Sequence, residues 1–335
     1  MSEIAPTPET SAEPMLSTER LIAAAQELAT TLEGVVLGQR TAIETLLVAY
    51  MAGGHALLEG VPGLGKTLLA RAFAACLGVR FSRVQFTPDL MPGDVLGTNV
   101  YDAATGSFRL LRGPVFTEVL MADEVNRTPP KTQAALLEAM QERQVTIDGV
   151  ALGLEPGFFV IATQNPIEFE GVYPLPEAQL DRFLVRIEMG LPSPAAELGL
   201  YRRAVAGTLV GFGEYGGELP GHVLRPGETL ALRQAARRVH VAEELLVYLA
   251  ELAAGVRRSP QVDLAVSPRA ALALLEGGRA AALLEGRDFL TPDDLKRLLV
   301  PCWAHRVLLT PESELEGFTP RQVLEGVAAA VPVPH

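Results

Sequence analysis

The residues best suited to chemistry lie between Gly60 and Thr67, where the chain runs GVPGLGKT. This spacing matches G-x-x-x-x-G-K-[ST], in which glycines let backbone N–H groups close around a phosphate and the lysine reaches the β- and γ-phosphates. Thr67 would supply a hydroxyl to Mg²⁺. A glycine-rich turn that fits by chance is the alternative, and the rarity of lysine, present only at positions 66, 131 and 296, disfavours it. The expected nucleotide-binding residues here are Gly60, Val61, Pro62, Gly63, Leu64, Gly65, Lys66, Thr67 and Leu68.

Two adjacent carboxylates, Asp123 and Glu124, end a strongly apolar stretch that begins at Val119. After a phosphate-binding loop, such a pair suits ATP hydrolysis. Asp123 would bind Mg²⁺ through its water shell, and Glu124 would orient and polarise the attacking water. An ordinary acidic turn after a strand is the alternative.

Two further polar positions follow expected strands. Asn165 lies at the tip of the stretch 158–163, where its amide could hold the attacking water or the γ-phosphate; a turn at Asn165-Pro166 is the alternative. Arg182 comes just before a fifth strand, and we expect it to neutralise charge on the γ-phosphate of a neighbouring subunit. A salt bridge to Asp181 would be the simpler explanation, and Arg127 is a rival for the same role.

Arg269 is a cation at the expected start of a helix, after Ser267 and Pro268. The helix dipole disfavours a cation there unless an anion is close. We expect Arg269 to reach the phosphates of its own subunit from the second domain, while a solvated arginine is the alternative.

These residues require a scaffold that brings strand ends together. Strand-like apolar runs alternate with helical patterns such as 131–141, which predicts a parallel sheet covered by helices. Two hairpins interrupt the alternation, one over 95–111 and one over 144–152, where Asp148-Gly149 is a strong turn signal. The expected strands are 56–59, 81–86, 119–123, 158–163 and 183–188.

Beyond residue 190 the composition becomes rich in Ala, Leu and Arg. The pairs Ser267-Pro268 and Thr291-Pro292 predict helix starts. We therefore expect a disordered tail over 1–17, an α/β nucleotide-binding domain over 18–190 and a helical domain over 191–335. Within the latter, 211–227 is glycine-rich and is expected to be a surface loop.

Composition narrows the function classes. The 335 residues are 48% hydrophobic and 20% charged, as in globular proteins, and no apolar run is long enough for a membrane span. A net charge of −12 argues against a broad nucleic-acid surface. Cys76 and Cys302 are too few for a disulfide framework, and no signal peptide is visible, so a cytoplasmic location is expected.

In their order along the chain, these motifs resemble an AAA+ ATPase. The stretch from Asp123 to Glu142, DEVNRTPPKTQAALLEAMQE, is similar to the signature of the MoxR subfamily, as are 86–94, 162–166 and 267–270. The resemblance covers roughly residues 18–333, with small departures at Val125 and Thr128, where Ile and Ala are common.

The resemblance implies a P-loop AAA+ core with strand order 5-1-4-3-2, an all-α C-terminal lid and a homo-oligomeric ring, usually a hexamer. It places Gly38 and Gln39 against the adenine and assigns Asn165, Arg182 and Arg269 to catalysis beside Glu124. The hairpins would project and touch substrate. Relatives act as chaperones that assemble or activate protein complexes, often with a separate partner carrying a von Willebrand factor A domain.

Two other functions remain open. Some AAA+ nucleic-acid motors share both hairpins, but the first carries only Arg109 and Arg112 as cations and the second carries none over 144–154. A P-loop small-molecule kinase is the other alternative, and Glu124 beside Asp123 favours water as the acceptor. The client and the closure of the ring are not encoded in a recognisable motif.

Overall fold

The computed structural model describes residues 17–165, 172–211, 216–225 and 227–334. The expected tail over 1–17 lies outside the described residues except for Ser17. Pro166 also lies outside them. The five-stranded parallel sheet has the order β2-β5-β8-β1-β9, which is the expected 5-1-4-3-2 order read from the other edge. Its strands are β1 (Ala56–Glu59), β2 (Phe81–Gln85), β5 (Val119–Asp123), β8 (Phe159–Gln164) and β9 (Val185–Glu188).

Strand boundaries follow the sequence closely. The fifth strand starts two residues later than expected, because Phe183 N–H bonds Leu180 O at 3.0 Å and so closes a turn before the strand begins. Alternate residues of each strand enter two separate apolar cores. Leu58 and Met121 pack with the helices on one face, while Leu57 and Leu120 pack with α5 (Pro130–Glu142) on the other.

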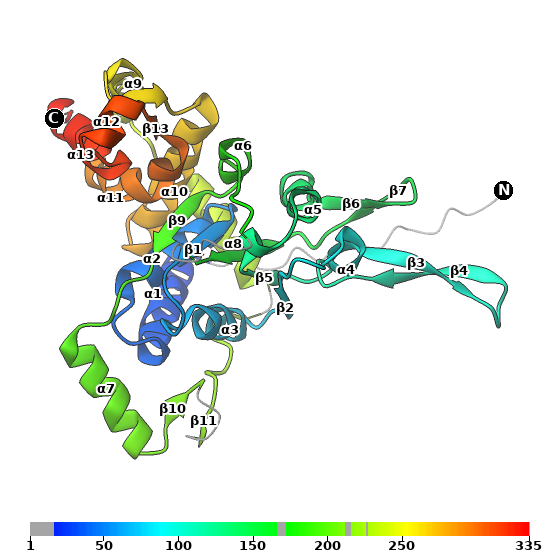
Figure 1. The fold of residues 1–335 in the computed structure, drawn as a ribbon. Helices are drawn as coiled ribbons and strands as arrows, with labels where there is room; N and C mark the ends of the chain where they lie inside the picture. Colours follow the sequence, from blue (N-terminus) through cyan, green and yellow to red (C-terminus); the bar gives the residue numbers. More distant parts are fainter. Residues whose placement is uncertain (1–16, 166–171, 212–215, 226, 335) are drawn as a thin grey trace, which may run out of the picture.

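The face that includes Leu58 carries α1 (Thr18–Val35), α2 (Arg40–Met51) and α3 (Lys66–Leu77). These helices share one continuous core with the C-terminal helices, and α10 (Pro268–Leu284) packs against α2 (Figure 1). The division into domains at residue 190 stays a prediction.

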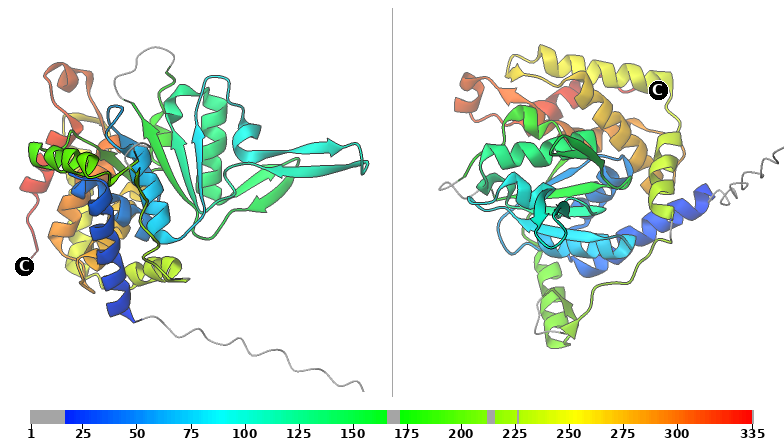
Figure 2. Two further views of the ribbon diagram at one scale, coloured as in Figure 1. Left: turned by 90° about the horizontal axis from the view of Figure 1, so that it is seen from below. Right: turned by 90° about the vertical axis from the view of Figure 1, so that its right-hand side faces the viewer.

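Both expected hairpins are present. The first pairs β3 (Gly97–Asp102) with β4 (Ser107–Arg112) after the short helix α4 (Pro92–Leu96), and the second pairs β6 (Gln144–Ile147) with β7 (Val150–Gly153). Asp148 and Gly149 both have positive φ, 48° and 81°, as the two-residue turn requires. The hairpins project from the same side of the core (Figures 1 and 2), and Asn99 Nδ2 donates to Asp148 Oδ2 at 2.7 Å between them.

The C-terminal part is helical, as expected, and also contains two small two-stranded sheets. Ser267 caps α10 by accepting from Ala270 N–H at 3.2 Å, and Thr291 and Asp294 form a capping box on α11. Helix α7 stands apart from α9 to α13 (Figure 1). The remaining elements are η1 (Val125–Arg127), α6 (Glu177–Leu180), α7 (Pro194–Val205), β10 (Leu209–Val210), β11 (Gly216–Gly217), α8 (Glu228–Arg238), α9 (Glu243–Arg258), β12 (Val262–Leu264), α10 (Pro268–Leu284), α11 (Pro292–Trp303), η2 (Ala304–Arg306), β13 (Leu308–Leu309), α12 (Pro311–Leu315) and α13 (Pro320–Ala330).

Candidate active site

The loop between β1 and α3 has the backbone of an anion cradle. Gly60, Gly63 and Gly65 have φ values of 157°, 86° and 88°, and the last two lie in the left-handed region that only glycine enters easily. Helix α3 begins at Lys66, so its free N–H groups and its dipole face the loop. The Lys66 ammonium donates to Gly60 O across the loop. Lys66 and Thr67 are thus both in the first turn of α3, as the sequence predicts.

The two acids lie at the carboxyl end of β5, next to β8 and β2 in the sheet. Asp123 Oδ1 accepts from the Thr163 hydroxyl at 2.6 Å, and its Oδ2 accepts from Arg83 at 2.5 Å and 3.1 Å. Thr163 Oγ1 also accepts the Glu124 N–H at 2.9 Å, so one hydroxyl fixes both acids. Asp123 is held by β8 on one side and by β2 on the other.

Glu124 has a left-handed backbone, with φ 57° and ψ 49°, which is uncommon for a residue with a side chain. This conformation turns its carboxylate off the line of β5. Its Oε2 accepts from Gln85 Nε2 at 2.7 Å and from Arg127 Nη1 at 3.0 Å. The rival arginine Arg127 is therefore engaged with Glu124 of its own chain.

Asn165 is buried just past β8, whose end pairs with the end of β1 through the register Glu59–Gln164. Gln164 Nε2 donates to Glu59 Oε1, and Arg186 Nε lies 3.6 Å from Glu59 Oε2. The phosphate loop, the two acids and Asn165 thus meet at one end of the sheet, where the carboxyl ends of β1, β5 and β8 lie side by side.

The segment expected to hold the adenine lies at the same end. Gln39 is buried and donates to Gly190 O at 2.8 Å, just after β9. Gly38 has φ 76°, and a Cβ there would lie 2.9 Å from Ala196 Cβ, so a larger residue would collide with α7. Val36 approaches the position of Gly65 in the phosphate loop. Residues 36–39, 60–67 and 189–196 therefore form one continuous wall.

Mg²⁺ commonly takes one or two protein oxygens and completes its shell with phosphate and water. The described residues hold no cluster of three or more metal-ligating side chains, so a closed protein cage is not formed among them. The oxygens of Asp123 and Thr67 fit the sparse protein contribution that Mg²⁺ with a nucleotide requires.

Arg182 and Arg269 lie at the opposite end of the sheet. Leu184 N–H bonds His55 O at 2.8 Å, which places the chain just before β9 at the amino end of β1. From His55 to Gly60 a strand rises about 16 Å, at roughly 3.3 Å per residue. Arg182 Nη1 donates to Leu137 O at 2.7 Å on α5, and β9 is an edge strand, as expected.

Arg269, expected from the sequence to reach the phosphates of its own subunit, lies beside Asp181 in the structure. Its Nε lies 3.9 Å from Asp181 Oδ2, at the amino end of β9. Asp181 is held there by the buried Arg306, whose Nε lies 2.8 Å from Asp181 Oδ1 and whose Nη2 donates to Phe183 O at 2.8 Å. The lid docks on the sheet through Arg306, and this docking keeps Arg269 at the end remote from Lys66.

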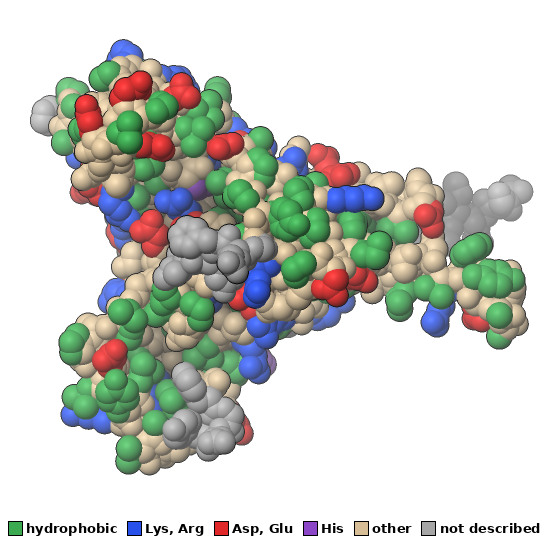
Figure 3. Space-filling model, in the orientation of Figure 1, with side chains coloured by type: hydrophobic (Ala, Val, Ile, Leu, Met, Phe, Trp, Pro, Cys, Tyr) green, Lys and Arg blue, Asp and Glu red, His purple; other side chains and the backbone are tan. Residues whose placement is uncertain are grey.

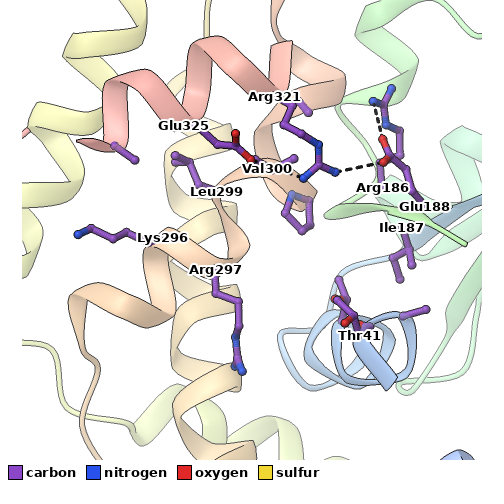
Figure 4. Close-up of a pocket in the computed structure, with 15 residues that line it drawn as sticks. Thr41, Arg186, Ile187, Glu188, Lys296, Arg297, Leu299, Val300, Arg321 and Glu325 are labelled. Carbon is purple, nitrogen blue, oxygen red and sulfur yellow. Dashed lines mark hydrogen bonds and ion pairs between the residues drawn. The ribbon is translucent and has the colours of Figure 1, made fainter. Parts of the chain in front are cut away.

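A cavity of about 310 Å³ lies between α2, the free edge of β9 and the helices α11 and α13 (Figure 4). Arg321 Nη2 lies 3.1 Å from Glu188 Oε2, and Arg186 Nη2 lies 3.5 Å from Glu188 Oε1. Exposed ion pairs of this kind contribute little to stability. The cavity marks the junction between the sheet edge and the lid and contains none of the expected site residues.

Residues 55–185 match the model of the ATPase family associated with various cellular activities, and residues 255–327 match an AAA lid domain. The chain is 39% identical to "Chaperone MoxR1" of Mycobacterium tuberculosis over 90% of this chain and 80% of that protein. It is 34% identical to "Protein MoxR" of Paracoccus denitrificans, over 90% and 94%. The chain belongs to the MoxR family of AAA+ ATPases.

The crystal structure of "a putative ATPase from Cytophaga hutchinsonii ATCC 33406" superposes on this MoxR-family chain with a TM-score of 0.85 at 37% identity. The superposition covers 95% of this chain and 97% of the other. The match therefore spans nearly the whole of both chains. This MoxR-family protein binds nucleotide and hydrolyses ATP. Among the described residues no helix has the length and apolar character needed to cross a membrane.

Sequence reasoning missed Arg83, Gln85 and Thr163, which hold the two acids of this MoxR-family site. The period-two alternation of β2 places Arg83 and Gln85 on one face. Because β2 neighbours β5, that face leads to Asp123 and Glu124. The strand order implied by the family, combined with this alternation, was the signal that could have found Arg83 and Gln85.

Proposed function

We propose that this ATPase couples Mg²⁺-dependent hydrolysis to the remodelling, assembly or activation of a protein client within a homo-oligomeric ring, for which six subunits is the expected number. Mg²⁺ would neutralise charge on the β- and γ-phosphates, with Thr67 and Asp123 as its protein ligands. Glu124 would take a proton from the attacking water, and Asn165 would orient that water or the γ-phosphate. The name of the Mycobacterium tuberculosis relative, a chaperone, supports this function.

One observation supports the proposed ring: the expected site residues lie at two opposite ends of the sheet. Lys66, Asp123 and Glu124 lie at the carboxyl ends, while Arg182 lies about 16 Å away along the strands, at roughly 3.3 Å per residue. An arginine side chain does not extend that far. Arg182 can therefore act on a nucleotide only if that nucleotide belongs to a neighbouring subunit.

A protein client fits the hairpins better than a nucleic acid does. Tyr101 and Phe108 are exposed on the first hairpin and contact each other with ring centroids 5.4 Å apart. Phosphate backbones are bound mainly through Lys and Arg, which are sparse here. A separate protein with a von Willebrand factor A domain is the partner we expect. The buried, unpaired Cys76 and Cys302 accord with a cytoplasmic location.

The test is a capture experiment with Glu124→Gln, which should bind ATP without hydrolysing it. Proteins retained by Glu124→Gln in ATP and absent with Lys66→Ala are the candidate clients. A titration of DNA and RNA against ATP turnover runs beside it. Stimulation by nucleic acid that falls steeply with salt, and no retained protein, would favour the motor instead.

A further inference from the structure

Among the described residues, helix α7 contacts the segment 34–38 of its own subunit through one face. Ala196 lies against Gly38, and a Cβ on Gly199 would come within 3.0 Å of Leu37 Cδ1. Arg203 Nη1 donates to Gly34 O. Residues 196, 199 and 203 are spaced by three and four, so they form one stripe that rests on the segment 34–38.

The opposite face of α7 is apolar and exposed. Leu198, Tyr201 and Val205 are 47%, 60% and 92% exposed. They too are spaced by three and four, and at about 100° per residue their stripe lies roughly 160° around the helix from the first. Figure 3 shows apolar side chains gathered over this projection, which Figure 1 identifies as α7. The stripe therefore points directly away from the body of the subunit.

A helix of this kind needs a partner. None of the residues of α7 is buried, although the helix has 12 residues, and an isolated helix of that length is marginal in water. Contiguous exposed apolar side chains usually mark an interaction surface. The outward stripe consisting of Leu198, Tyr201 and Val205 is therefore a candidate docking surface.

The position of α7 indicates which partner docks on its outward stripe. The helix follows directly on the segment 189–192, which forms a wall with Gln39 and the phosphate loop, so it stands at the nucleotide end of the sheet. A subunit that brings its Arg182 to this nucleotide must approach the same end. We propose that the outward stripe of α7 docks on a second copy of this chain, an inference that rests on the proposed ring.

The first test is assembly of Val205→Asp, measured by native mass spectrometry over a range of protein concentrations with ATP and the Glu124→Gln background. Buried interface side chains commonly account for much of the affinity, so the concentration for half assembly should rise at least about tenfold. Val247→Asp is the matched control, because Val247 is 56% exposed on the lid helix α9 and should assemble as the parent does. Unchanged assembly of Val205→Asp would overturn the proposal, with circular dichroism showing that both variants are folded.

The second test measures contact at α7 directly and does not require the interface to be disrupted. Val205→Cys is labelled with a maleimide–benzophenone, which spares Cys76 and Cys302 because burial raises the pKa of both thiols. Labelled subunits are mixed with ¹⁵N-labelled unmodified subunits and illuminated. Cross-links to ¹⁵N peptides support the proposal; cross-links confined to the labelled chain, or none in assembled rings, contradict it.

The first test measures assembly by mass and the second measures contact by cross-linking, so neither requires ATP turnover. An assembled ring with cross-linked α7 and no client would disprove the proposed function alone. A client-binding ATPase whose α7 stays free would disprove this inference alone.

Discussion

Gln85 Nε2 lies 2.7 Å from Glu124 Oε2, so a residue of the edge strand β2 holds the expected catalytic carboxylate. Arg127 donates to the same oxygen at 3.0 Å. These two donors hold Oε2 in place on the side of β2. We expect the carboxylate to turn away from at least one of them before this oxygen contacts an attacking water.

Replacing Gln85 with Ala should therefore raise basal ATP turnover several-fold. A hydrogen bond to a charged group contributes about 1.5 kcal/mol or more, and about 1.4 kcal/mol corresponds to a tenfold change in rate. Phosphate release at saturating ATP measures the effect. Ser82→Ala, on the same strand and away from Glu124, is the control. Turnover equal to or below that of the parent would show that Gln85 does not restrain Glu124.

The phosphate loop and Glu124 should separate binding from chemistry. Lys66→Ala should lose ATP binding because the loop loses its ammonium. Glu124→Gln should keep binding and lose roughly 10²-fold or more in turnover, the usual scale for loss of a general base. Fluorescent nucleotide binding and phosphate release measure the two effects. A Glu124→Gln protein with normal turnover would remove Glu124 from its role.

Arg182→Ala should bind ATP normally and lose on the order of 10²-fold or more in turnover, by analogy with arginine fingers that contribute roughly 10³ to 10⁵. Since Arg182 lies at the end of the sheet remote from Lys66, mixing Arg182→Ala with Lys66→Ala should restore activity that neither variant has. Mixed rings are verified by mass spectrometry. Mixed rings without recovered turnover would move the prediction to Arg127.

Arg269 should follow the same pattern, because its ion pair with Asp181 places it beside Arg182. Arg269→Ala mixed with Lys66→Ala should also recover turnover. An arginine that serves its own subunit would give a different result, since the intact Arg269 would then belong only to the chains that cannot bind ATP. Arg258→Ala is the control, because Arg258 is another exposed lid arginine, paired with Glu251.

His55 should make the fold sensitive to mild acid. Its Nδ1 accepts from Val160 N–H at 3.0 Å, its Nε2 lies 3.2 Å from Met140 O, and burial lowers its pKa from 6.5 to about 3. Between these pH values the unfolded chain binds a proton that the folded chain does not, so stability present above pH 6.5 is lost as pH falls. From pH 7.5 to 5.5 this histidine should cost about 1.4 kcal/mol.

Urea unfolding at the two pH values checks this expectation. His55→Gln is less stable at both but should lose about 1.4 kcal/mol less than the parent on acidification. His222, which is exposed, provides the control, and His222→Gln should lose as much as the parent. Buried His305, whose pKa is also lowered by burial, accounts for acid sensitivity that remains in His55→Gln.

The strands and the phosphate loop were predictable because each depends on local residues. An apolar run such as Val119–Asp123 and the glycines of residues 60–65 carry their structure in their own sequence. The placement of Arg269 was not predictable, because it depends on how the lid docks on the sheet through Arg306 and Asp181, which are 125 residues apart in sequence. No pattern within a short stretch of sequence encodes a contact between residues so far apart along the chain. The isolation of α7 from the other C-terminal helices escaped prediction for the same reason.

The strand β2 has a mechanical consequence. Among the described residues this edge strand pairs only with β5, and its Arg83 and Gln85 bind Asp123 and Glu124. The chain continues from β2 through α4 into the hairpin β3–β4. A displacement of this hairpin can therefore be transmitted along the backbone to the side chains that hold Asp123 and Glu124, and a movement of Glu124 can reach the hairpin by the same route.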